Sequence, residues 1–161
     1  HKTQYTYYSN DVKNELGNKS VPSHWVLMTR DVIPNTRSKA YEDQKKLVVV
    51  HAQKSGQLYE LPMTIDVVTC ILMEHVQTGK KLYGDNPLTY THCQEKVDDK
   101  WPVTIGGFFD GGLGVSHNWR YRLDEAIGGV GGSRKFSTLL FVFGTWNEEW
   151  TMVFGGKTGR S

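Results

Sequence analysis

The clearest hydrophobic pattern in the chain has the period of an α-helix and covers residues 61–78. Its apolar positions recur every three or four residues, at Leu61, Ile65, Val68, Leu72 and Val76. This spacing predicts a helix with one buried apolar stripe. Pro62 suits its first turn and Gly79 suits its end. Polar residues and a thiol fall on the opposite side, at Asp66, Cys70, Glu74 and Gln77.

Residues 38–55 carry a pattern that fits two kinds of element. Ser38 would cap a helix that stops at Gly56, whereas the run Leu47–Val50 is rich in β-branched residues and equally fits a buried strand. We favour a helix over residues 39–55, because charged residues flank the apolar run and a capping signal precedes it.

Most of the remaining patterns predict short strands. They cover residues 24–33, 88–97, 103–109, 113–119, 126–130, 136–143 and 150–154. The last two form a predicted hairpin, whose first strand is apolar on both faces and therefore central in a sheet. Nine of the 17 glycines lie between Gly106 and Gly132, among strand-forming residues. Glycines in that setting provide positive φ, bulges or room for close backbone approach.

Helices gathered early in the chain and strands gathered late favour the α+β class. We expect a mainly antiparallel sheet of five to seven short strands, with the helix over 61–78 and the second helix over 39–55 packed on it. Cap signals at Ser9 and Gly17 add a short helix between them. Residues 1–161 are expected to form one globular domain. Because the chain starts at His1 rather than Met, we expect a processed form or a piece excised from a longer chain.

Composition and motifs exclude several classes of function. Nineteen basic and 17 acidic side chains leave a net charge of +2, too balanced to indicate nucleic acid or an anionic membrane as partner. No apolar run approaches the roughly 20 residues of a membrane-spanning helix. The stretch Gly155–Thr158 lacks the upstream glycine of a phosphate-binding loop, and no metal-ligand spacing occurs. We therefore expect no cofactor and no metal, and the sequence indicates no compartment.

The candidate for catalysis is Cys93, which follows His92 in a predicted strand. Neighbouring strand residues point to opposite faces, so Cys93 needs a base from elsewhere. His117 would serve, with Asp110 or Asp124 to orient its imidazole. A small cysteine-dependent hydrolase or transferase using Cys93 and His117 is therefore the alternative function.

Aromatic and arginine side chains beside predicted turns carry the strongest functional signal. They are Trp119, Arg120, Tyr121, Arg122, Trp146 and Asn147, with Asp110 as a further polar contact. Tryptophan, tyrosine and arginine are the residue types that dominate binding hot spots. The sequence therefore favours a non-catalytic binding module that recognises a protein, with a glycan as the second choice of ligand. A structural subunit that self-assembles through strand edges is a further alternative.

Overall fold

The computed structural model of the chain describes residues 8–83, 87–109, 111–117, 128–129, 132–136 and 150–154. These residues form an α+β fold, as expected, with helices α1 (Asn10–Leu16), α2 (Tyr41–Ser55) and α3 (Thr64–Thr78). Its strands are β1 (Trp25–Thr29), β2 (Tyr90–Val97), β3 (Trp101–Phe109), β4 (Gly112–Ser116), β5 (Gly128–Gly129), β6 (Ser133–Phe136) and β7 (Trp150–Phe154). Within the described ranges, no helix is long and apolar enough to cross a membrane.

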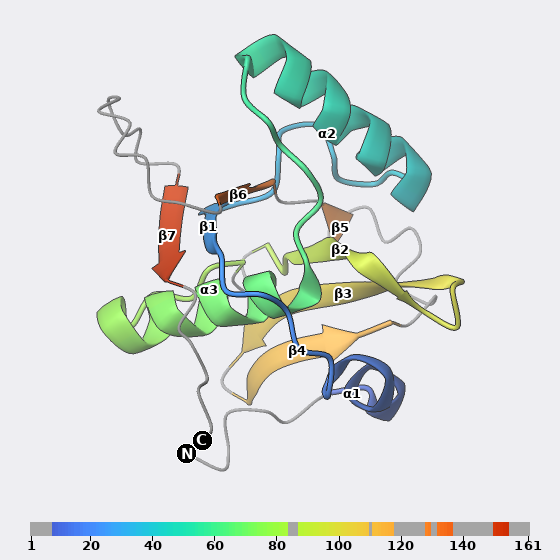
Figure 1. Cartoon of the computed structure of the whole chain (residues 1–161), viewed down its shortest axis with the longest axis vertical. Helices are drawn as coiled ribbons and strands as arrows, with labels where there is room; N and C mark the ends of the chain where they lie inside the picture. The colour runs from blue at the N-terminus through green and yellow to red at the C-terminus, as the bar shows by residue number, and fades with distance from the viewer. Residues whose placement is uncertain are drawn as a thin grey trace.

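The strands form two sheets rather than the single expected sheet (Figure 1). One sheet is antiparallel and has the order β6-β1-β7. The other has the order β4-β3-β2-β5, in which β5 runs parallel to β2 and the other neighbours are antiparallel. In the described residues β6 and β7 each pair with β1. The first strand of the predicted hairpin, residues 136–143, lies outside the described residues except for Phe136. The pairing with β1 joins residues far apart in the chain, and local patterns carry no information on it.

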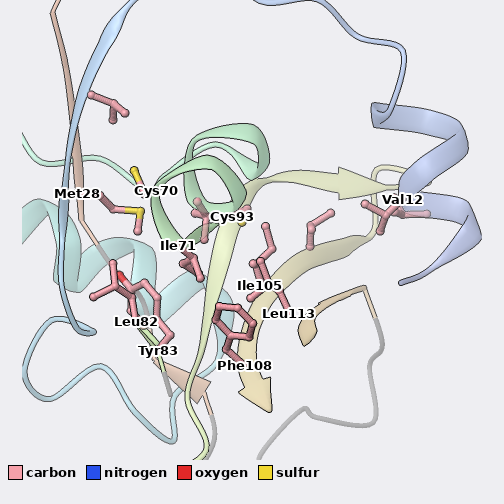
Figure 2. Packing of buried hydrophobic residues seen from close by; sticks show 14 residues of the cluster. Val12, Met28, Cys70, Ile71, Leu82, Tyr83, Cys93, Ile105, Phe108 and Leu113 are labelled. Carbon is pink, nitrogen blue, oxygen red and sulfur yellow. The ribbon is translucent and has the colours of Figure 1, made fainter. Parts of the chain in front are cut away.

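Helix α3 contacts β1 and β7 of one sheet and β2 and β3 of the other. Its buried residues are Thr64, Asp66, Val67, Cys70, Ile71 and Glu74. Cys70 and Ile71 lie in the main core together with Met28 of β1 and Cys93 of β2, as Figure 2 shows. Because strands of both sheets pack against it, α3 buries a wider face than one apolar stripe.

The predicted buried stripe of this helix is only partly right: Val68 and Leu72 are partly buried against the main core, but the two other positions within the helix are exposed. Leu61 is buried, but Ile65 is 47% exposed and Val76 is 77% exposed. Two carboxylates of the predicted polar side lie inside instead, each with a hydrogen-bond partner: Asp66 bonds to His24, and Glu74 accepts from the Thr78 hydroxyl. Such partners offset the cost of removing a polar group from water.

The segment that fitted either element is a helix, α2, which ends at Gly56 in the left-handed conformation. A buried polar side chain attaches it to the rest of the fold. Gln44 is fully buried, donates from Nε2 to the carbonyl oxygen of Thr36, and accepts at Oε1 from Nδ1 of His92 on β2. Val48 supplies the apolar part of the contact, in a small second core with Ile33 and Leu61.

The backbones of β2 and β3 approach closely where these two strands pair. Gly106 on β3 pairs with Tyr90 and has a φ of 150°, in the region that favours glycine. A Cβ at this position would lie 2.2 Å from the carbonyl oxygen of Thr89. Glycine is therefore required here by both conformation and space.

Candidate functional site

The predicted binding residues lie outside the described residues. They are Trp119, Arg120, Tyr121, Arg122, Trp146 and Asn147, and the same holds for Asp110 and Asp124. The structure does describe residues on either side of Trp119–Arg122. His117 follows the end of β4, and Gly128 begins β5. Trp119–Arg122 therefore belongs to the connection between β4 and β5, which are the two outer strands of the described four-stranded sheet.

His117 contacts the beginning of α1, where it meets a hydroxyl and a carboxylate. Its Nδ1 lies 2.7 Å from Oγ of Ser9, and its Nε2 lies 3.4 Å from Oδ2 of Asp11. Ser9 is the N-cap of α1, and its Oγ accepts from the backbone N–H of Val12 at 3.5 Å. The Ser9 hydroxyl still has its proton to donate, and it can give it to Nδ1 in the tautomer whose hydrogen is on Nε2, the nitrogen nearer to Asp11.

Backbone pairing holds these three side chains together. Tyr8 forms a parallel bridge with Val115 on the outer edge of β4, and the N–H of Ser9 donates to the Val115 carbonyl at 2.9 Å. The beginning of α1 is thereby tied to the end of β4. The group remains open to solvent, because the side chain of His117 is 22% exposed and that of Asp11 is 63% exposed.

Cys93, the predicted nucleophile, lies in a different environment. It is fully buried in the main core. Burial raises the pKa of its thiol well above the usual 9.0, and the Glu95 carboxylate adds to the rise, although the Thr64 hydroxyl partly opposes it. The thiolate, which is the reactive form, is therefore strongly disfavoured.

The structure does not bring Cys93 and His117 together. Strand β3 lies between β2, which carries Cys93, and β4, which His117 follows. The backbones of β2 and β4 are therefore two strand spacings apart, about 10 Å. Among the described residues the hydrogen bonds and ion pairs of His117 go to Ser9 and Asp11.

His92 belongs to a third environment, on the side of β2 that meets α2. Besides its bond to Gln44, its ring packs edge-on against Tyr41 at 5.4 Å between centroids. Burial lowers the pKa of His92 to about 4. The imidazole is therefore neutral near pH 7, with Nδ1–H held by Gln44, and it serves the docking of α2.

The sequence analysis paired His117 with Cys93, whereas the structure places Ser9 and Asp11 beside the His117 ring. Ser9 carried a local signal, as the cap of a short helix, and nothing in that signal points to His117, which lies 108 positions away. Gln44 was missed for the same reason, because its two partners lie in other segments of the chain.

Across the described part of the chain, no group of three His, Cys, Asp or Glu side chains is arranged to hold a metal ion. The chain matches no protein-family model, no curated protein and no solved structure. Function must therefore be argued from the residues themselves.

Proposed function

We propose that the chain is a binding module that recognises a protein through Trp119–Arg122 and the pair Trp146 and Asn147. A glycan is the less favoured ligand. The observation that carries the proposal is that Trp119–Arg122 follows an anchored point of the fold. It begins two residues after His117, whose ring is hydrogen-bonded to Ser9 and lies 3.4 Å from the Asp11 carboxylate.

Two physical arguments support this function. Trp and Tyr supply a large contact area at low entropic cost, and Arg supplies directed donors, so their clustering is typical of hot spots. In addition, the strands that flank this segment, β4 and β5, belong to one sheet. Fixing both ends of a segment lowers the entropy that its side chains lose on binding.

The hydrolase or transferase built on Cys93 and His117 ranks second, since burial of the Cys93 thiol and the contacts of His117 both oppose it. Self-assembly through strand edges is the remaining alternative. It predicts a concentration-dependent oligomer, which light scattering after size exclusion detects directly.

The test is affinity capture with the purified chain as bait, followed by calorimetry with each captured protein in purified form. Trp119→Ala and Trp146→Ala should each weaken binding by more than about 2 kcal/mol, roughly 30-fold in Kd. Val76→Ala, at an exposed position on α3, is the matched control and should bind like the wild type. A parallel glycan array covers the second ligand class.

Unchanged melting temperatures for the two Trp variants are part of the expectation, because a binding aromatic is not a core residue. Unaltered affinity in both Trp variants would contradict the proposal. Loss of folding in both would assign these side chains to the core instead.

A further inference from the structure

Where His117 contacts α1, its imidazole lies between the hydroxyl of Ser9 and the carboxylate of Asp11. We propose that Ser9 is a nucleophilic serine, with His117 as its base and Asp11 as the group that orients the base, and that it accepts acyl groups from small carboxylic esters. The proposed binding residues take no part in this reaction, although the contacts of His117 with Ser9 and Asp11 also anchor the segment that carries Trp119–Arg122.

The distances fit the roles of a serine nucleophile and its base. Oγ of Ser9 and Nδ1 of His117 are 2.7 Å apart, which is hydrogen-bond reach for proton transfer. Oδ2 of Asp11 lies 3.4 Å from the other ring nitrogen, close enough to favour the tautomer that leaves Nδ1 free to accept. Such constellations are recognised by geometry and roles rather than by order in the sequence.

The orientation of the ring is inverted relative to the familiar serine triad, since Nδ1 rather than Nε2 faces the hydroxyl. The chemistry is unaffected by this inversion. A neutral imidazole has one N–H donor and one acceptor nitrogen, and either nitrogen can take either role.

Helix capping does not account for the whole arrangement. A cap needs only an oxygen that accepts from the backbone, and Ser9 supplies this to the N–H of Val12. It needs neither a ring nitrogen on the hydroxyl nor a carboxylate on the far side of that ring. These two extra contacts leave the imidazole 22% exposed and reachable from solvent.

The reaction balances as ester hydrolysis. Ser9 Oγ bonds to the acyl carbon while its proton moves to Nδ1 of His117, and the resulting imidazolium is stabilised by the Asp11 carboxylate, 3.4 Å from Nε2. The bond from the acyl carbon to the leaving alcohol breaks, and the alcohol takes the proton from Nδ1. Water then attacks the acyl-serine, gives its proton to Nδ1, and the bond to Oγ breaks. Ser9 regains its proton, and a carboxylic acid is released.

The test is covalent labelling of the folded protein with a fluorophosphonate probe, with the labelled residue located by mass spectrometry. We expect label at Ser9 and none at the exposed Ser20. His117→Gln should slow labelling by about 100-fold or more, the lower range for loss of a general base. Asp11→Asn, at a 63% exposed position, should remain folded and slow labelling by a smaller factor.

Ser9→Asn is the matched control, because asparagine caps helices as well as serine does but has no nucleophilic hydroxyl. It should keep the wild-type melting temperature, lose the label, and lose hydrolysis of p-nitrophenyl acetate. Labelling of Ser9 no faster than that of Ser20, or labelling that His117→Gln and Asp11→Asn leave unchanged, would overturn the proposal. A positive result would add catalysis to the binding role.

Discussion

Replacing Ile71 by Ala tests which face of α3 is buried. Ile71 is fully buried, whereas Val76, on the predicted stripe, is 77% exposed. Burying an isoleucine side chain is worth about 1.5–3 kcal/mol, and the cavity left by truncation adds to the loss. Alanine regains at most about 0.7 kcal/mol through its higher helix propensity. We therefore expect Ile71→Ala to lower the free energy of unfolding by about 3 kcal/mol.

The control substitution is Val76→Ala in the same helix. An exposed valine loses little burial on truncation, and the gain in helix propensity offsets that loss, so the change should stay within about 0.5 kcal/mol. Ile71→Val, which removes one methyl group, should fall between them at about 1 kcal/mol. Urea unfolding followed by circular dichroism measures all three, and an unchanged slope with denaturant shows that the same transition is being compared.

The result that would refute this reasoning is a reversal of the order. A loss above about 1.5 kcal/mol for Val76→Ala, together with a loss below about 1 kcal/mol for Ile71→Ala, would return the buried face to the stripe that includes Ile65 and Val76. In that case the packing of α3 between the sheets would be wrong.

Three further predictions follow from buried groups. Because the pKa of His92 is about 4 rather than 6.5, the folded state binds fewer protons between those values, so stability should fall by up to about 3 kcal/mol as the pH drops through them. His92→Gln should flatten this dependence in urea midpoints measured from pH 7 to 4. Burial raises the thiol pKa of Cys70 and Cys93, so a disulfide reagent at pH 8 should modify them only after unfolding, and rapid native labelling of Cys93 would restore it as a nucleophile. Gly106→Ala should cost about 3 kcal/mol from strain and overlap, against about 1 kcal/mol for Gly56→Ala, where the φ is 65° and a Cβ meets nothing within 4 Å; equal losses would show that overlap at Thr89 is absent.

Local chemistry explains what could be predicted from the sequence. The short helix between Ser9 and Gly17 and the ends of α2 and α3 at Gly56 and Gly79 all depend on capping within a few residues. Such signals act over one helical turn and are visible in the chain itself. The α+β class could be predicted because the order of helices and strands along the chain is also visible in the sequence.

The side of α3 that is buried could not be predicted in this way. Its apolar residues are numerous enough to suggest a stripe, but the two sheets decide which residues lie inside. Asp66 is accommodated only because His24, 42 positions away, meets its carboxylate at 2.9 Å. A pattern along one helix contains no record of such a partner.

The same limit applies to the histidines, and comparing three of them shows what separates a structural role from a chemical one. Both ring nitrogens of His24 already face acceptors, the carbonyl of Pro22 and the carboxylate of Asp66. His92 is held by an amide, and burial keeps it neutral. Of these three, His117 is the one whose ring nitrogen meets a hydroxyl, the group that an imidazole can turn into a nucleophile. All three side chains are chemically the same, and contacts across the fold determine which atom faces each ring. Because the atom that faces His117 is the Ser9 hydroxyl, labelling of Ser9 is the experiment that tests catalysis.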